Sequence, residues 1–267
     1  HAERKFNGKV VSYPRHYFYQ TYKLDGVSLA LYYEKGVLVA AGTRPRDGID
    51  GEDVTENVKY VAGIPQQLKL PVTCSIRGEL ICKLADFEIV QAELAAAGEK
   101  LRANPRNHAA GGIRQFKDPT ETKLARLSFI GFGIENLDNP PYKTEIERAK
   151  YANKELGVTF ARCQEFNFYD LEKLEKNVPN LDYEVDGVVI GVNDLEEQEQ
   201  LGRHGGTPTG NPKGKLAWKF AEERARPTLK SIEWKTGRSG SITPVGIFDA
   251  VALAGTQVGR ATLHNLG

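Results

Sequence analysis

Alternating apolar positions are the clearest pattern in the first part of the chain. They lie on both sides of a polar turn at Glu34-Lys35-Gly36: Val27, Leu29, Leu31, Val37 and Val39. A period of two is that of a half-buried β-strand, and glycine in the turn favours a reversal of the chain. The pattern predicts a β-hairpin over residues 19–41, with Lys23 near the start of its first strand.

The middle of the chain mixes helical and strand patterns. Helical spacing predicts helices over 53–61, 84–97 and 144–156, the second with Phe87, Val90, Leu94 and Ala97 along one side. The first helix must end before Ile64-Pro65, because proline disfavours a helical conformation in the residue before it. Apolar runs predict strands over 72–81, 127–134 and 183–192. Strands and helices without a regular alternation indicate an α+β fold.

The C-terminal part has a different pattern. Residues 202–214 are rich in Gly, Pro and Thr and predict a loop. After Pro227 the pattern is that of strands alone, over 229–235, 243–253 and 256–262, with a glycine-rich turn at 236–241. We therefore expect two domains, residues 1–222 and the start of an all-β domain at residues 223–267.

Composition narrows the class of protein. The 267 residues can bury a sizeable core, and no apolar run approaches the ~20 residues of a membrane span. The N-terminus has no apolar signal core, which predicts a cytoplasmic location without a membrane partner. We also expect a monomer. Cys74, Cys82 and Cys163 are odd in number and lack C-x-x-C spacing, which predicts free thiols rather than disulfides or a zinc site.

Charge is unevenly distributed along the chain. The net charge is only +1, yet residues 201–267 hold ten Lys and Arg against four Asp and Glu. A local basic surplus favours contact with a phosphate backbone, although a solvated basic loop needs no partner. The C-terminal third is thus the expected place for nucleic acid.

Candidate chemistry begins with the tetrapeptide Lys23-Leu24-Asp25-Gly26, which sets an amine beside a carboxylate and a glycine. A lysine that attacks a phosphate must be neutral, although its ordinary pKa is about 10.4. Burial beside other positive charges disfavours the ammonium form. Lys23 is therefore a candidate nucleophile.

The tetrapeptide is followed by four further motifs in a fixed order: Arg77-Gly78-Glu79, Asn104-Pro105-Arg106-Asn107, Asp186-Gly187-Val188-Val189-Ile190 and Trp218-Lys219-Phe220. In this order and spacing they resemble the adenylation domain of the NAD-dependent DNA ligases, within the covalent nucleotidyltransferase superfamily. The resemblance implies an α+β, ATP-grasp-like ligase domain of antiparallel sheets and helices. It also implies that the C-terminal strands begin an OB-fold domain.

The same resemblance implies roles for the nucleotide-binding residues. Lys23 becomes lysyl-AMP, Asp25 contacts the ribose or orients the lysine, and Lys219 contacts the α-phosphate. Glu79 binds ribose hydroxyls, since a carboxylate only accepts hydrogen bonds. Phe132 stacks on adenine, where flanking glycines would let a flat base approach, although a core phenylalanine is the competing explanation.

Phosphate and metal contacts are implied at further positions. Arg106 and Arg114 resemble two arginines that grip phosphates of AMP and of the nicked strand, a task that suits the guanidinium fork. Arg44, or equally Arg46, resembles a further family arginine. Asp186, with Glu79, is the expected ligand set for Mg²⁺. His108 replaces a small family residue and is expected to face solvent.

Three positions depart from the family pattern. Thr21 replaces a glutamate, Gly191 a lysine and Val178 an arginine. Each change removes a polar or charged contact to the nucleotide. Lys213 and Lys215 are candidates for supplying the missing charge, and we expect both to bind phosphate or DNA.

The sequence thus favours a DNA ligase that seals nicked duplex DNA through lysyl-AMP, with NAD as AMP donor and Mg²⁺. Only 22 residues precede Lys23, whereas these ligases carry there a small helical domain that binds the nicotinamide mononucleotide half. ATP therefore stays open as the donor. An ATP-dependent DNA or RNA ligase is one alternative, and a non-catalytic nick-binding module is another.

Overall fold

The structure is a computed structural model. It describes residues 2–6, 9–13, 17–43, 51–206, 210–220, 225–237, 240–253 and 256–263. The chain divides into two compact units, His1–Phe220 and Ala221–Gly267, and each is described by itself. The first begins with a two-stranded ribbon of β1 (Ala2–Phe6) and β2 (Lys9–Tyr13).

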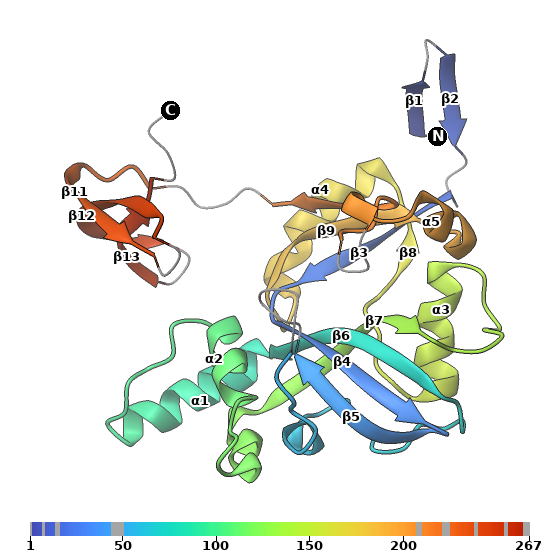
Figure 1. The fold of residues 1–267 in the computed structure, drawn as a ribbon, viewed down its shortest axis with the longest axis horizontal. Helices are drawn as coiled ribbons and strands as arrows, with labels where there is room; N and C mark the ends of the chain where they lie inside the picture. The colour runs from blue at the N-terminus through green and yellow to red at the C-terminus, as the bar shows by residue number, and fades with distance from the viewer. Residues whose placement is uncertain are drawn as a thin grey trace. The chain divides into compact units, whose positions relative to one another are not determined.

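One four-stranded sheet of the first unit has the order β10-β9-β3-β8 (Figure 1). Its strands are β3 (Phe18–Leu24), β8 (Gln164–Glu165), β9 (Val185–Val192) and β10 (Lys215–Lys219), all paired antiparallel. Strands distant in sequence are therefore neighbours in this sheet. The predicted strand 183–192 is confirmed, as β9.

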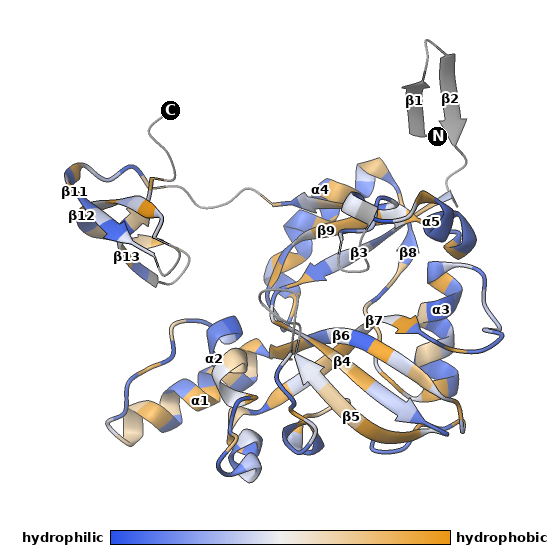
Figure 2. Ribbon diagram, in the orientation of Figure 1, coloured by the Kyte–Doolittle hydropathy of each residue, from blue (hydrophilic) through white to orange (hydrophobic). Residues whose placement is uncertain are grey.

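A second four-stranded antiparallel sheet has the order β5-β4-β6-β7. It comprises β4 (Val27–Glu34), β5 (Val37–Thr43), β6 (Cys74–Cys82) and β7 (Leu127–Glu135). The predicted strands 72–81 and 127–134 are thereby confirmed. Figure 2 shows apolar residues along these strands, and Leu31, Ile76 and Leu80 are completely buried.

The predicted hairpin over 19–41 is correct only from Val27 onwards. β3 pairs with β9 and belongs to the other sheet, so Lys23 lies near the C-terminal end of β3 rather than at the start of a hairpin strand. In β5 the register shifts between the pairs of Tyr32 and Tyr33, and Val37 and Val39 are exposed. The turn and the alternation depend on residues close together in sequence. The partner strand of β3, in contrast, is distant in sequence.

Helices cover the two sheets. They are α1 (Leu84–Ala96), α2 (Pro105–Gly112), α3 (Glu145–Tyr151), α4 (Leu171–Asn177) and α5 (Leu195–Leu201). α3 starts with a capping box of Thr144 and Glu147 and continues into a π-helical turn at Ala152–Leu156, as the prediction for 144–156 required. Short 3-10 helices lie at Pro119–Ala125, Phe168–Asp170, Val178–Asn180 and His204–Gly206.

The prediction of a helix over 53–61 was wrong in extent. Only a 3-10 turn forms, at Asn57–Tyr60. Asp53 accepts hydrogen bonds from the backbone and hydroxyl of Thr55, and Val54 donates its N–H to Ala41. These hydrogen bonds differ from those of a regular α-helix and compete with them. The helix at 84–97 did form, although Ala97 is exposed and Val90 is the buried member of its apolar side.

Two adjacent glycines at the end of α2 should respond oppositely to alanine. A Cβ on Gly111 meets nothing within 4 Å, whereas one on Gly112 would overlap the Cβ of Ala125. We expect Gly111→Ala to stabilise the protein by about 0.5–1 kcal/mol by lowering chain entropy in the unfolded state. Gly112→Ala should destabilise it by about 1–3 kcal/mol through overpacking. Urea unfolding midpoints measure both, and equal shifts would contradict the packing around Ala125.

In the described residues of the second unit, three strands form a sheet of order β11-β12-β13. They are β11 (Leu229–Thr236), β12 (Ile242–Leu253) and β13 (Thr256–Thr262), paired as an antiparallel meander. All three predicted strands are therefore present.

Candidate nucleotide-binding site

Lys23 lies where β3 ends beside β9. Its ammonium Nζ is 2.7 Å from Oδ2 of Asp186, and the two side chains are 33% and 26% exposed. The ion pair joins residues 163 positions apart in sequence, because antiparallel pairing sets Lys23 opposite Gly187. The candidate nucleophile and the candidate metal ligand thus meet directly.

Asp186 occupies a β-bulge. Lys23 pairs with Gly187 and Leu24 pairs with Val185, so Asp186 is the extra residue on β9. Lys219 Nζ lies 4.0 Å from the same Asp186 oxygen, since β10 sets Lys219 opposite Gly187 from the other side. A bulge re-aims a side chain locally, and here it brings one carboxylate between two lysines.

Asp25 pairs with Arg106 rather than with Lys23. The guanidinium Nη1 of Arg106 is 2.6 Å from Oδ1 of Asp25, and Arg106 remains 57% exposed. Arg106 sits in the first turn of α2, which starts at Asn104 because its side chain accepts the backbone N–H of Asn107 and Pro105 fits the first helical position. The loop motif therefore reaches the lysine motif through an ion pair.

Glu79 is the most perturbed carboxyl group of this site. Burial raises its pKa to about 7, against the opposing effects of Lys23, Arg106 and the Gly26 amide, while Asp25 raises it further. Its place on β6, opposite Ser28 of β4, puts it beside the end of the lysine motif. A carboxyl with a pKa near neutrality is typical of a functional site.

Arg114 lies in the segment that follows α2. Its Nε is 2.5 Å from Oε2 of Glu52, and its Nη1 donates to the carbonyl of Ala110 at 2.7 Å. Arg44 and its alternative Arg46 lie outside the described residues.

Phe132 is 41% exposed on β7. The register shifts there, because Gly131 pairs with Gly78 and Gly133 with Arg77, which leaves Phe132 as the bulged residue. The explanation of Phe132 as a core residue is therefore wrong. Of the two glycines that flank Phe132, Gly131 packs against the ring of Phe160, whereas a Cβ on Gly133 would only contact Arg77 at 3.7 Å.

The expectation that His108 faces solvent was wrong. Its side chain is buried in α2, where the ring donates Nε2–H to the carbonyl of Ala125 at 3.0 Å and packs near Phe87. Burial lowers the pKa of His108, the Ala125 carbonyl opposes this, and Arg102 lowers it further. The residue therefore supports the packing of α2.

Acid should therefore destabilise the protein through His108. The unfolded chain takes up a proton at about pH 6.5, whereas the folded chain resists protonation, so stability present above that pH is lost as the pH falls toward the lowered pKa. We expect wild type to lose more stability than His108→Gln between pH 8 and pH 5.5, measured by urea unfolding. Equal losses in both proteins would contradict the assignment.

Two of the three departures from the family pattern, Thr21 and Gly191, fall on one sheet. Thr21 points its Oγ1 into a buried position without a hydrogen-bond partner in the described structure. Gly191 stands opposite Tyr19 of β3 and Lys215 of β10. Val178, the third departure, lies outside that sheet, at the start of a 3-10 helix.

Of the two lysines expected to supply missing charge, Lys215 is the one paired with Gly191. Lys213 is exposed in the preceding loop. Lys215 is only 27% exposed, and its Nζ is 2.7 Å from Oε1 of Glu145.

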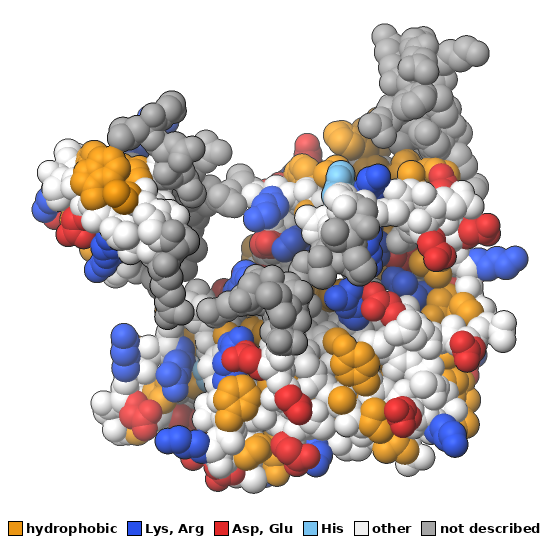
Figure 3. Space-filling model, in the orientation of Figure 1, with side chains coloured by type: hydrophobic (Ala, Val, Ile, Leu, Met, Phe, Trp, Pro, Cys, Tyr) orange, Lys and Arg blue, Asp and Glu red, His pale blue; other side chains and the backbone are white. Residues whose placement is uncertain are grey.

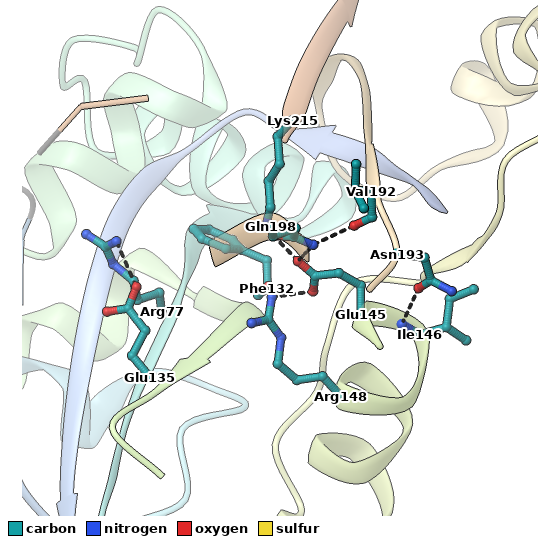
Figure 4. Close-up of polar contacts among 10 residues, drawn as sticks. All are labelled: Arg77, Phe132, Glu135, Glu145, Ile146, Arg148, Val192, Asn193, Gln198 and Lys215. Atoms are coloured by element: carbon teal, nitrogen blue, oxygen red, sulfur yellow. Dashed lines mark hydrogen bonds and ion pairs between the residues drawn. The ribbon is translucent and has the colours of Figure 1, made fainter. Parts of the chain in front are cut away.

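Glu145 lies in a buried charged cluster (Figure 4). The sequence did not predict this cluster. Glu145 is 5% exposed and receives Lys215, Arg148 and the Nε2 amide of Gln198, the last at 2.9 Å. Burial tends to raise the pKa of Glu145, but Arg148 and Lys215 outweigh it, and the pKa is lowered. The only local signal was the capping box next to Glu145, which gives no hint of these partners.

Asp186 offers a feature suited to a cation. Its Oδ1 is buried and lacks a hydrogen-bond partner in the described chain. The described residues contain no group of three His, Cys, Asp or Glu side chains that could hold a metal ion. Mg²⁺ commonly binds through one or two carboxylates together with waters and substrate phosphates, so Asp186 fits a shared metal site.

Thiols, helices and surface charges bear on the expectations drawn from composition. Cys74, Cys82 and Cys163 are free thiols, as predicted. Within the described residues, none of the helices combines the length and apolar character needed to span a bilayer. Basic and acidic side chains are interspersed over the visible face of the first unit (Figure 3).

A lysine set among carboxylates and further cations, carried by two antiparallel sheets, is the arrangement that the resemblance to the covalent nucleotidyltransferases implied. The family model of the NAD-dependent DNA ligase adenylation domain matches residues 3–223, and that of the OB-fold domain of these ligases matches residues 226–267. The chain belongs to the NAD-dependent DNA ligase family, as the motif series predicted.

Individual relatives of the chain are also DNA ligases. The DNA ligase of Acetivibrio thermocellus is 39% identical over 91% of this chain and 37% of its own length. That of Acinetobacter baumannii is 37% identical over 92% and 37%, and that of Lactobacillus helveticus 39% identical over 96% and 38%. The chain thus spans less than two fifths of these relatives. Among solved structures, mycobacterial DNA ligase D complexed with ATP and MES aligns with 91% of this chain and 66% of its own at a TM-score of 0.45 and 13% identity.

Proposed function

We propose that this chain is the AMP-accepting part of a DNA ligase that seals nicks in duplex DNA with NAD as the AMP donor. The observation that carries the proposal is the convergence of the Lys23–Asp186 pair, Lys219 and the Asp25–Arg106 pair at one point. Each group suits the transfer of a phosphoryl group to an amine.

Lys23, whose side chain is 33% exposed, gives up a proton to water, and its Nζ attacks the α-phosphate, forming a P–N bond as the phosphoanhydride bond breaks. The leaving nicotinamide mononucleotide takes the electron pair. Lys219 lies where it can stabilise charge on the phosphate, and Asp186, together with Glu79, would hold Mg²⁺. When bound, that ion would neutralise negative charge on the phosphate.

The remaining residues position the two substrates. Phe132 supplies an exposed ring for stacking on adenine, and Glu79 accepts from ribose hydroxyls. Arg106, Arg114 and Lys213 bind phosphates of the nucleotide and of nicked DNA, while Arg44 is a further candidate. AMP passes to a 5′-phosphate, and a 3′-hydroxyl then displaces it. We place this reaction in the cytoplasm, carried out by a monomer with residues 1–222 as the adenylation domain and residues 223–267 as the start of the OB domain.

Covalent labelling tests the proposal. The protein is incubated with Mg²⁺ and either NAD or ATP carrying a label in the adenylate, then separated under denaturing conditions. We expect label from NAD and none from ATP. Label from ATP alone would instead favour an ATP-dependent ligase. Salt-sensitive binding of nicked DNA without any label would favour the non-catalytic module.

A further inference from the structure

The face of the sheet that carries Lys23 has two rows of residues. Register sets Lys23, Gly187 and Lys219 in one row across β3, β9 and β10. Tyr19, Gly191 and Lys215 form a second row four residues away along the same strands. Because directly opposed residues and every second residue share a face, both rows lie on one side, about 13 Å apart.

The second row is occupied by an oriented ammonium group. The Tyr19 ring fills the space above Gly191, where a Cβ would lie 2.5 Å from a ring carbon. Lys215 Nζ lies 5.7 Å from the centroid of that ring and 2.7 Å from Glu145. A cation over an aromatic face beside a carboxylate is fixed in position.

Glu145 is a support for Lys215 rather than a ligand-binding group. Its Oε1 accepts from Gln198 and Lys215, and Arg148 occupies Oε2. The cluster of Glu145, Arg148 and Lys215 carries one surplus positive charge, and Lys215 is the more exposed of its two cations, at 27% against 12% for Arg148. A lysine ammonium has three N–H donors, so Lys215 keeps donor capacity after its bond to Glu145.

The cluster also contacts the backbone of Phe132, the residue that carries the exposed aromatic ring. Arg148 Nη2 donates to the carbonyl of Phe132 at 3.4 Å, which ties α3 to the bulge of β7 (Figure 4). Between the two rows lies Thr21, with its buried Oγ1 lacking a partner among the described residues. A nucleotide with its phosphate at Lys23 and its base on Phe132 therefore extends toward Lys215.

We propose that Lys215 is a specificity residue of the nucleotide site, donating a hydrogen bond from its ammonium to a ring nitrogen of the purine, with Glu145 as its positioning residue. The inference rests on the proposed function, since it needs an adenylate at Lys23. It assigns recognition of the base edge to β10 and α3.

The test uses single-turnover formation of labelled lysyl-AMP at increasing NAD. Lys215→Met should raise the half-saturating NAD concentration roughly 10- to 100-fold, the range for a hydrogen bond to a charged group. Because this variant leaves Glu145 short of one partner, the double variant Lys215→Met/Glu145→Gln restores the charge balance and should show the same loss. Lys154→Met, whose side chain is 85% exposed, should behave as wild type.

Three NAD analogues, with adenine N1, N3 or N7 replaced by C–H, separate recognition from support of the fold. For wild type, one of these analogues should raise the half-saturating concentration by a factor similar to that of Lys215→Met. For Lys215→Met, the same analogue should raise it no further than NAD does. The inference is overturned if Lys215→Met saturates as wild type does, or if every analogue affects both proteins equally. Absence of label on wild type refutes the proposed function instead, which keeps the two failures distinct.

Discussion

Replacing Lys23 with arginine is expected to abolish covalent labelling by NAD. Arginine keeps the positive charge beside Asp186, but its guanidinium stays protonated and cannot act as the nucleophile. The loss should be complete rather than partial, because no P–N bond can form without the amine. Labelled protein after denaturing electrophoresis is the measurement.

Two controls make this result specific. Lys59→Arg, in an exposed pair with Glu56, should label as wild type. Thermal unfolding of Lys23→Arg should match wild type, since the 33% exposed side chain keeps its charge. Undiminished labelling of Lys23→Arg would place the nucleophile at another residue and remove the basis of the proposed function.

Gly26→Ala should cause the second large loss, in both stability and labelling. A Cβ at Gly26 would overlap the carbonyl oxygen of Leu80 and lie 3.1 Å from Cγ of Glu79. Backbone cannot yield cheaply, so we expect a destabilisation of about 1–3 kcal/mol or more. A displacement of about 1 Å at Lys23 or Asp25 would slow labelling about 100-fold.

Gly42→Ala is the matched control. It lies in a strand of the second sheet, and its added Cβ would be an ordinary 3.7 Å from the carbonyl of Glu52. Urea unfolding and the initial rate of lysyl-AMP formation should show little change for Gly42→Ala and large losses for Gly26→Ala. Similar behaviour of both variants would show that close approach of Gly26 to β6 has no importance for the site.

Much of the site was accessible from sequence because its motifs are short and local. The start of α2 follows from Asn104 and Pro105, since capping depends on neighbouring backbone groups. The motif series that contains Lys23, Glu79 and Lys219 predicted that the chain belongs to the NAD-dependent DNA ligases, and the family comparison confirms that membership. Apolar alternation likewise predicted β4, because burial of one face requires a period of two, and apolar runs predicted β6 and β7.

Sequence by itself determined which residues are capable of the chemistry and most of the strands that carry them. The tertiary structure alone decided their partners: Lys23 with Asp186, Asp25 with Arg106, and Lys215 with Glu145. It also decided that Asp186 and Phe132 stand at β-bulges and that His108 is buried. The physical reason is that strand register, bulges and desolvation arise from contacts between distant segments, which no local pattern of residues specifies.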